Sequence, residues 1–300
     1  MTTMKAVVFY YSQSGQALDA AKSICSSLSD VVYKQIVPQQ EYPFPWDKYD
    51  FFGQFPETRL LLPPSGIKPI ELSDVEDADI VMIVGQSWYL SPSLPIQSFM
   101  QDETTRQYLN GRNVVFVNVC RNMWLMTSRW LKQEMRKINA NLIGQIILQD
   151  EHQNLVSALT IVRWLMYGKK APSLGLPAAG IAEKDIKDAT RFGQIIANNF
   201  ENGKTAELQD DLLSAGAIHY KPSVLFLEKV GYRMFGLWAP FIRRRGEYGD
   251  KRRKTRLNMF FYYLLFVLFI LSPFAQIVFW LTAPFRRIAH HRAIDTSVDR

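Results

Sequence analysis

The sequence of 300 residues predicts an α/β protein with a doubly wound, five-stranded parallel sheet, followed by a C-terminal amphipathic and membrane-embedded helical extension. Two observations predict the sheet. Short continuous apolar runs, typical of strands buried on both faces, recur along the chain, and stretches with helical spacing separate them. A third observation predicts the extension, because residues 259–285 contain no charged side chain.

Five apolar runs have the length and composition of buried strands. The first two run from Lys5 to Tyr11 and from Val31 to Ile36. Three more follow at 78–85, 113–119 and 142–148. With helices between them, this spacing favours the strand order 2-1-3-4-5, in which ligands bind where the carboxyl ends of the strands meet.

Helical periodicity falls between and after these runs, with apolar residues gathered on one face. Proline removes a backbone hydrogen bond, so the last of these helices is expected to end before Pro240. The expected helices are 18–28, 130–138, 156–166, 184–202 and 224–238.

The stretch 38–69 interrupts this alternation of strands and helices. It contains seven prolines and several aromatic residues, among them Phe44 and Trp46. Long connections without regular structure are uncommon in compact domains and often act as lids. An aromatic lid over an apolar substrate and a packed structural excursion both fit this composition.

The chain divides into four parts. Residues 1–205 form the α/β domain, 206–258 an amphipathic and basic membrane-proximal region, 259–285 a membrane segment, and 286–300 a basic tail. The charge-free segment exceeds the roughly 20 apolar residues that cross a hydrocarbon core. Pro273 near its middle leaves a kinked single span and a re-entrant hairpin open. The heavier basic flank predicts that the domain lies at the cytoplasmic face of the inner cell membrane.

Charge and cysteine content exclude several classes of protein. From Arg243 onward there are 12 Lys and Arg against 4 Asp and Glu, which leaves 23 against 24 before it, so the formal charge of +7 belongs to the C-terminal part. The domain has no basic stripe, and nucleic acid is not an expected partner. Cys25 and Cys120 give no disulfide framework and no metal-ligand spacing, and reduced thiols are expected. No signal peptide is expected at the N-terminus.

A polar turn follows the first strand directly and consists of Ser12, Gln13, Ser14, Gly15 and Gln16. At a strand-to-helix turn, hydroxyls and backbone N–H groups bind a phosphate dianion with the help of the helix dipole. Gly15 allows a close approach of the backbone. The absence of lysine argues against a Walker-type nucleotide loop. The alternative interpretation is that Ser14 only caps the helix.

Two further loops follow the third and fourth strands and reach the same edge of the sheet. Each contains a tryptophan suited to pack against a flat ring, together with polar groups suited to bond its edge. The candidate residues are Ser87, Trp88 and Tyr89 in the first loop and Cys120, Arg121, Asn122 and Trp124 in the second.

The polar turn and these two loops resemble the three loops of the flavodoxin-like superfamily that hold the phosphate and isoalloxazine ring of FMN. The resemblance implies FMN binding through these residues, with Trp88 or Tyr89 facing the flavin. Flavodoxin turns usually end in a hydroxyl where this chain has Ala17, which implies one fewer phosphate contact.

A narrower resemblance spans roughly residues 4–290. Together with the apolar C-terminal segment, its motifs resemble the aromatase of dialkylresorcinol and flexirubin-type lipid biosynthesis, often labelled dialkylresorcinol condensing enzyme. This implies FMN-dependent oxidation of a dialkyl cyclohexane-1,3-dione, a lipid-like cyclic diketone, to a dialkylresorcinol, with biosynthetic ketosynthase or acyl-carrier partners. The motifs are Tyr11 to Gln16, Phe44-Pro-Trp46, Phe51-Phe52, Phe55-Pro-Glu57, Arg121-Asn-Met-Trp124, and Leu142-Ile-Gly144 leading to Asp150.

The residues themselves favour oxidation over condensation. Condensation of acyl thioesters generally needs a cysteine nucleophile backed by histidines, and Cys120 has no histidine near it in sequence. His152 is a candidate base for proton removal, or else an ordinary loop histidine. Arg121 is suited to stabilise an enolate oxygen, or else to form a structural ion pair. A membrane-associated quinone reductase and a non-catalytic electron carrier remain as alternative functions.

Overall fold

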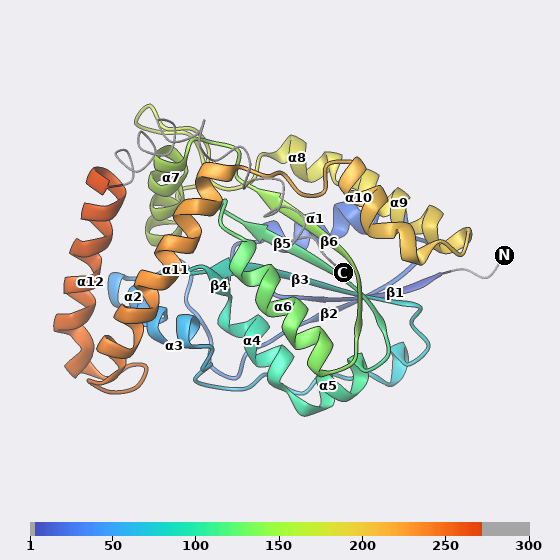
Figure 1. Ribbon diagram of the computed structural model, residues 1–300, viewed down its shortest axis with the longest axis horizontal. Coiled ribbons are helices and arrows are strands. Elements are labelled where there is room, and N and C mark those ends of the chain that lie inside the picture. The colour runs from blue at the N-terminus through green and yellow to red at the C-terminus, as the bar shows by residue number, and fades with distance from the viewer. Residues whose placement is uncertain (1–3, 272–300) are drawn as a thin grey trace, which may run out of the picture.

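The computed structural model describes residues 4–271 (Figure 1). The predictions for Pro273, for the second half of the apolar segment and for the basic tail concern residues outside this range. A sheet of long parallel strands occupies the centre, in the order β2-β1-β3-β5-β6. These strands are β1 (Lys5–Tyr10), β2 (Asp30–Gln35), β3 (Ile80–Trp88), β5 (Asn113–Cys120) and β6 (Asn141–Gln149).

The sheet has six strands, so the prediction of five is wrong, and with the sixth strand counted the order is β2-β1-β3-β5-β6 in place of 2-1-3-4-5. The additional strand is β4 (Ser91–Pro92), which pairs antiparallel with the end of β3 and sets Ser87 opposite Pro92. Two residues, one of them proline, form no apolar run that a sequence pattern can reveal. Because of this pairing, β3 continues to Trp88, past its expected end at Gly85.

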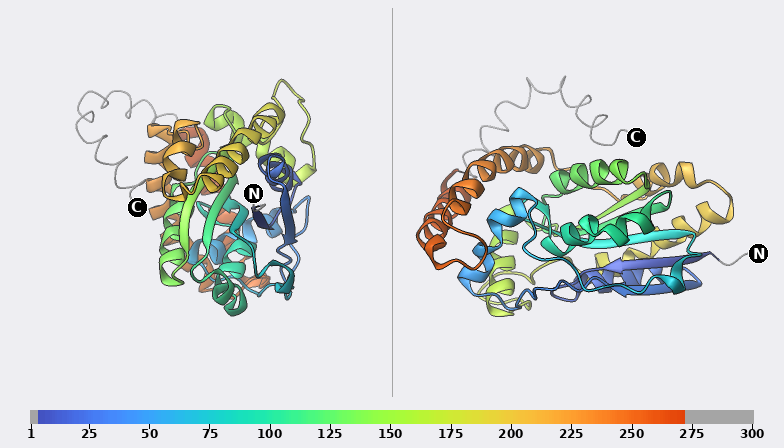
Figure 2. Two further views of the ribbon diagram at one scale, coloured as in Figure 1. Left: turned by 90° about the vertical axis from the view of Figure 1, so that its right-hand side faces the viewer. Right: turned by 90° about the horizontal axis from the view of Figure 1, so that it is seen from below.

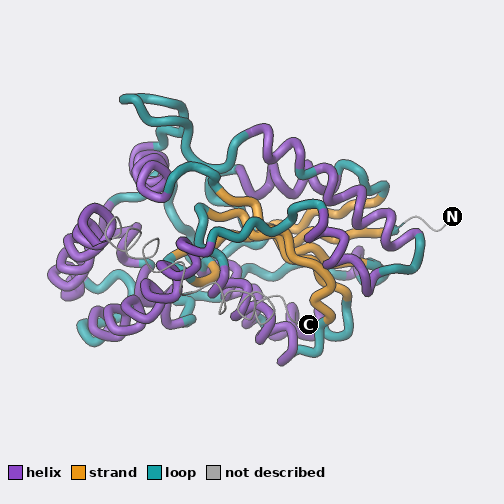
Figure 3. The backbone as a smooth tube through the Cα atoms, turned by 45° about the horizontal axis from the view of Figure 1, so that its top comes forward, coloured by secondary structure: helices purple, strands orange, loops and turns teal. Residues whose placement is uncertain are grey.

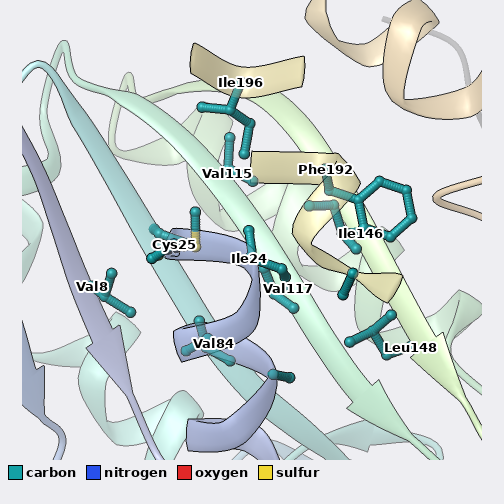
Figure 4. Packing of buried hydrophobic residues seen from close by; sticks show 14 of the residues in the cluster. Val8, Ile24, Cys25, Val84, Val115, Val117, Ile146, Leu148, Phe192 and Ile196 are labelled. Atoms are coloured by element: carbon teal, nitrogen blue, oxygen red, sulfur yellow. Dashed lines mark hydrogen bonds between the residues drawn. The ribbon is translucent and has the colours of Figure 1, made fainter. Parts of the chain in front are cut away.

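Alternate side chains of the parallel strands enter two cores. Helices lie on both faces of the sheet (Figure 3). On one face, Val8 and Val117 pack with Phe192 (Figure 4). On the other, Phe9 and Phe116 belong to the second core. The helices of the first face are α1 (Gln16–Cys25), α8 (Glu183–Asp188), α9 (Thr190–Glu201) and α10 (Leu208–Ser214). Those of the second face are α4 (Leu94–Gln101), α5 (Glu103–Leu109) and α6 (Leu125–Lys137).

Close packing of α9 on α1 depends on Gly193. A Cβ atom there would lie 1.7 Å from the carbonyl oxygen of Ile24, so no larger residue fits without backbone movement. The helix expected over 184–202 is broken in two by a tight turn at Ala189, whose N–H donates to the carbonyl of Ile186. The turn lets both halves direct apolar side chains into the same core.

The proline-rich stretch 38–69 contains two short helices, α2 (Lys48–Gly53) and α3 (Phe55–Leu60). Phe52 and Phe55 are buried in a third core that also contains Phe260 from the C-terminal part of the chain. The rings of Phe55 and Phe260 are stacked, with centroids 3.8 Å apart and an interplanar angle of 10°. Most of this stretch is therefore packed against other elements.

Helix α11 (Pro222–Arg243) passes through Pro240, so the prediction that it ends before this proline is wrong. Pro240 falls in the last turn, where its missing N–H removes a single hydrogen bond. Ala239 and Ile242 on either side of it are completely buried. Packing of this last turn therefore outweighs the lost bond.

Helix α12 (Lys254–Phe266) runs back beside α11 at the end of the molecule far from the N-terminus (Figure 2). Leu257 and Phe260 are buried on one face, while Tyr262 and Phe266 are exposed on the other. By length and composition alone, one helix among the described residues, Lys251–Leu271, is long and apolar enough to cross a membrane. The remaining elements are α7 (Asn154–Tyr167), η1 (Ser73–Val75), η2 (Thr205–Glu207), η3 (Lys251–Arg253) and the π-helical η4 (Val267–Leu271).

Candidate functional site

A cavity of about 120 Å³ lies where the carboxyl ends of β1, β3, β5 and β6 meet, with α7 on one side. The structure brings together seven of the residues predicted from the sequence: Gln13, Ser14, Gln16, Ser87, Trp88, Cys120 and Arg121. The rest of the lining consists of Gln86, Val119, Asp150, Ile161, Trp164, Leu165, Gly180 and Ile181.

The turn between β1 and α1 leaves backbone donors free of helical partners. Gly15 is the N-cap, with φ +93° and ψ −36°, a conformation that glycine adopts without strain. No side chain caps the helix from Gly15, and Ser12 Oγ instead accepts from the N–H of the third helical residue at 3.2 Å. The first N–H groups of a helix, here those of Gln16 and Ala17, have no intrahelical acceptor. The turn therefore presents donors to an anion.

The glutamine side chains of this turn form hydrogen bonds with other parts of the protein. Gln16 Nε2 donates to the carbonyl of Ile181 at 2.8 Å, and the N–H of Ile181 donates to Gln16 Oε1 at 3.1 Å. Gln13 Nε2 donates to the carbonyl of Pro43 at 3.1 Å. At Gly180, with φ +83°, a Cβ would lie 2.3 Å from Gln16 Oε1. This close approach requires glycine, and it closes the cavity on the α1 side.

Two indole rings line the cavity. Trp88 is held edge-on by Tyr11 and Trp46, with ring centroids 6.0 and 5.2 Å away and interplanar angles of 78° and 89°. Trp164 of α7 meets Phe44 edge-on, with ring centroids 6.3 Å apart. Trp164 is only 6% exposed, so its position is set by packing. The cavity is therefore bounded by aromatic rings from two distant segments.

Tyr89 and Trp124 do not line the cavity, although the sequence made them candidates to face a ring. The hydroxyl of Tyr89 donates to the carbonyl of Phe51 at 2.6 Å. β3 ends at Trp88, and Tyr89 begins the turn to β4 in the left-handed region, with φ +48°, so the chain leaves the strand direction there. Trp124 is 3% exposed and packs edge-on against Tyr220, at the start of α6.

Ser87 lines the cavity from the end of β3 and is held by two neighbours. Its Oγ lies 2.8 Å from Thr127 Oγ1, and it accepts a hydrogen bond from Asn118 Nδ2 at 2.9 Å. This small network fixes the hydroxyl at the cavity wall.

Arg121 reaches the cavity from the end of β5 and bonds to amide oxygens. Its Nη1 donates to the main-chain and side-chain oxygens of Asn154 at 2.9 and 3.0 Å. Burial lowers the pKa of Arg121 to about 10, an effect partly opposed by the charge of Asp150, so the guanidinium stays protonated near neutrality. Burial also raises the pKa of the Cys120 thiol, which makes it a poor nucleophile. Asn122 lies outside the cavity lining and donates to Asn154 Oδ1 at 3.0 Å.

A buried carboxylate orients the imidazole of His152. Asp150 is 1% exposed; its Oδ1 lies 2.6 Å from His152 Nδ1, and its Oδ2 accepts from Ser157 Oγ at 2.7 Å. A hydrogen bond from Nδ1–H to this carboxylate leaves Nε2 as the basic nitrogen. Asp150 lines the cavity, whereas His152 lies beside it with its side chain 36% exposed.

Several lining residues escaped the sequence analysis as site residues. Cys120 and Arg121 were chosen because they directly follow the fourth predicted strand. Asp150 follows the fifth strand in the same way, so the same criterion would also have selected it. Trp164 lies in a helix that carries apolar residues on its exposed side as well as its buried side, so an indole at the site looks like any other apolar residue of the helix. Gly180 and Ile181 belong to a loop with no periodic pattern, and no sequence signal marks them.

The chain was also compared with known proteins. No family model and no curated protein matches it. Among solved structures, a flavodoxin from the domain Archaea is similar, with 17% identity over 66% of this chain and 99% of that chain and a TM-score of 0.37.

Two further structures are similar at the same level. A flavoprotein in complex with FMN from Lactobacillus acidophilus NCFM has 18% identity over 48% of this chain and 93% of that chain, with a TM-score of 0.41. A WrbA-like flavodoxin from Agrobacterium tumefaciens has 11% identity over 66% and 98%, with a TM-score of 0.40. The assignment of an α/β fold with a parallel central sheet rests on the strand order and the two helical layers.

Proposed function

We propose that this protein binds FMN in the cavity at the carboxyl edge of the sheet and acts as a flavin-dependent oxidoreductase at a membrane surface. One observation carries the proposal. A single cavity is lined by the turn that starts α1, by the indoles of Trp88 and Trp164, and by the guanidinium of Arg121. An anion-binding turn next to flat apolar walls and one half-buried cation matches a ligand with a phosphate at one end and an aromatic ring at the other.

The β1–α1 turn fits the phosphate. The N–H groups of Gln16 and Ala17 start the helix, Ser14 adds a hydroxyl, and the helix dipole favours negative charge there. Gly15 is exposed, so a ligand reaches the backbone without displacing a side chain. The phosphate contacts therefore come from the backbone and Ser14, because the amides of Gln13 and Gln16 bond to the protein.

The indole rings are suited to pack against the flavin ring, but the cavity is smaller than the ring system requires. Pockets that bury a whole cofactor are typically about 300–1,000 Å³, against about 120 Å³ here. Binding the full ring system therefore requires an outward shift of a wall. We place this shift in the Gly180–Ile181 segment, because it is a loop outside the sheet and helices, joined to the turn by two hydrogen bonds with the Gln16 side chain that a ligand can replace.

The substrate class follows from the sequence resemblance: a dialkyl cyclohexane-1,3-dione, oxidised to a dialkylresorcinol. The ring loses one hydride and one proton as a carbon–carbon double bond forms, and enolisation completes the aromatic ring. Bound FMN supplies the hydride acceptor. His152 Nε2, with Nδ1 held by Asp150, takes the proton next to a carbonyl, and Arg121 stabilises the developing enolate oxygen.

A membrane location suits a substrate with two alkyl chains, because such chains partition into lipid at about 0.8 kcal/mol per buried methylene. The apolar helix that includes α12 supports this placement, at the cytoplasmic face of the inner membrane. There the enzyme would receive its cyclic diketone from biosynthetic ketosynthase or acyl-carrier partners. The third core, which joins α12 to the proline-rich stretch 38–69 (the insertion), holds the domain against the helix.

Absorption spectroscopy of the full chain purified in detergent tests FMN binding. We expect a flavin spectrum, or uptake of added FMN by the apoprotein. A colourless preparation that takes up no FMN would contradict the proposal.

Anaerobic mixing with the dione is then expected to bleach the flavin and form the resorcinol, identified by its mass. Failure to bleach with the dione, with rapid reoxidation of reduced flavin by a quinone, would favour a quinone reductase; flavin binding without either reaction would favour an electron carrier.

A further inference from the structure

The turn between α11 and α12 borders an open hollow, which shares no lining residue with the cavity at the carboxyl edge of the sheet. Its volume is about 430 Å³. Four of the residues around it are arginines, and one is an acid, Glu247. The lining consists of Arg243, Arg244, Arg245, Gly246, Glu247 and Arg252.

The turn is held in a defined shape. Gly246 has φ +129°, and a Cβ there would lie 2.2 Å from Asp250 Oδ2, so the chain passes closely over this carboxylate. Asp250 Oδ1 accepts from the N–H of Arg252 at 2.8 Å. The next residue, Arg253, is buried and pairs with Glu57 of α3 at 2.9 Å, which fastens the turn to the domain.

The arginines divide into paired and unpaired groups. Arg252 is paired with Asp250 at 2.5 Å, and Arg243 lies 3.4 Å from Glu57 and 3.5 Å from Glu247. Within residues 4–271, Arg244 and Arg245 form no ion pair, and both are exposed.

A third cation, Arg256, lies within electrostatic reach of Arg244 and Arg245. It donates to the carbonyl of Phe241, near the end of α11. Guanidinium groups crowded in this way favour an anion that they can share, and their planar forks match phosphate oxygens.

The position of the turn indicates where such an anion comes from. It lies at the start of the apolar helix Lys251–Leu271. The charged residues of this helix all lie within its first six positions, 251–256, so its charge-free part begins at Leu257, directly after the turn. A bilayer entered by this charge-free part places the turn at the level of the lipid head groups.

We propose that Arg244 and Arg245, with Arg243 and Arg252 beside them, bind the phosphate of an anionic phospholipid head group. The proposal rests on the membrane-surface part of the proposed function and is independent of flavin binding. It adds a specific head-group site to the apolar anchor, and the buried Arg253–Glu57 pair links this site rigidly to the domain.

The test is calorimetric titration of the full chain, in a neutral detergent, with dihexanoyl phosphatidylglycerol, dihexanoyl phosphatidylcholine and inorganic phosphate. Phosphatidylglycerol is expected to bind at least tenfold more tightly than either of the others. The double variant Arg244→Gln/Arg245→Gln should weaken that binding by roughly an order of magnitude or more, because each basic side chain near a lipid surface contributes several-fold. Both side chains are exposed, so the variant should fold, which circular dichroism checks.

Lys184→Gln/Lys187→Gln is the matched control, because it removes the same charge from the exposed face of α8. It should bind phosphatidylglycerol like the unaltered chain. Equal affinity for the two lipids, an equal loss in the control, or inorganic phosphate binding as tightly as phosphatidylglycerol would each overturn the proposal. Because no step uses flavin, a failure here is distinguishable from a failure of FMN binding.

Discussion

Glu57 and Arg253 form an ion pair that is almost completely shielded from solvent. Arg253 Nη2 lies 2.9 Å from Glu57 Oε2, and both side chains are 1% exposed. Arg253 also donates to the carbonyl of Gly53, so one guanidinium joins α2 and α3 to the turn that begins α12. This ion pair therefore fixes the insertion to the helical hairpin formed by α11 and α12.

Removing one partner of this pair should destabilise the protein strongly. Glu57→Gln leaves a buried guanidinium uncompensated, and we expect a loss of about 3–5 kcal/mol in the free energy of unfolding. Glu57→Gln/Arg253→Met removes both charges and should recover much of that loss. Asp74→Asn, which breaks the exposed pair with Lys34, should change the thermal midpoint little. Equal thermal midpoints for the Glu57 and Asp74 variants would show that the buried pair contributes no more to stability than the exposed pair.

Substitution of Gly15 should abolish FMN retention. Gly15→Val places a β-branched residue at φ +93° in the turn that we assign to the phosphate, so the backbone donors must move. Gly111→Ala is the control, since Gly111 also has positive φ (+74°) but lies in open space at the start of β5. The flavin content of the two purified variants measures FMN retention. Wild-type FMN affinity in Gly15→Val would count heavily against a phosphate site at the β1–α1 turn.

His152 should affect the chemical step without affecting cofactor binding. His152→Ala removes the imidazole that Asp150 orients, and we expect the rate of flavin bleaching by the dione to fall by about 10²–10⁴ with FMN content unchanged. His219→Ala, at an exposed position, should leave the rate as it was. A bleaching rate in His152→Ala that equals the unaltered rate at every pH would exclude the proposed base.

Glu228 should make stability depend on pH. It is completely buried in α11 and accepts from the N–H of Met126 at the start of α6 at 2.8 Å. Burial raises its pKa from 4.5 to about 7. The folded state therefore retains a proton that the unfolded chain loses, and stability falls as the pH rises from about 4.5 to about 7, by at most about 3 kcal/mol.

Thermal unfolding of Glu228→Gln between pH 4.5 and 8 measures this effect, since glutamine keeps an acceptor for the Met126 N–H and cannot ionise. The difference in midpoint between the variant and the unaltered chain should widen as the pH rises and become constant above about pH 7. A constant difference over the whole range would show that Glu228 does not titrate there.

Truncation should release the domain from membranes, provided that it spares the third core. Deleting residues 267–300 leaves Leu257 and Phe260 packed against the insertion. We expect the shortened protein to appear in the soluble fraction of a lysate, with the full chain in the membrane fraction. Continued sedimentation of the folded, shortened protein with membranes would reveal another anchor.

The sequence predicted those parts of the fold whose signal is local. β5 and β6 are nearly continuous apolar runs, and their positions were predicted to within a few residues. The break at Ala189, the passage of α11 through Pro240 and the two-residue β4 depend on packing between distant segments, which no local pattern records.

The same division applies to the candidate site. The polar turn and Arg121 follow strand ends and were predicted from that position. Gln16 was expected to face a ligand, but its side chain bonds to Ile181, 165 positions away. Trp164 was missed because its helix has apolar residues on both its exposed and its buried side, which gives no indication of which ring lines a cavity.

The stacked rings of Phe55 and Phe260 have a consequence for biogenesis. As the chain leaves the ribosome, the aromatic side chains of the insertion emerge early, and their partners on α12 follow only after most of the protein has been made. Until then these apolar surfaces stay uncovered and prone to aggregation, which is the situation in which chaperones act. Translation near the bilayer would let the last helix dock and insert in one step.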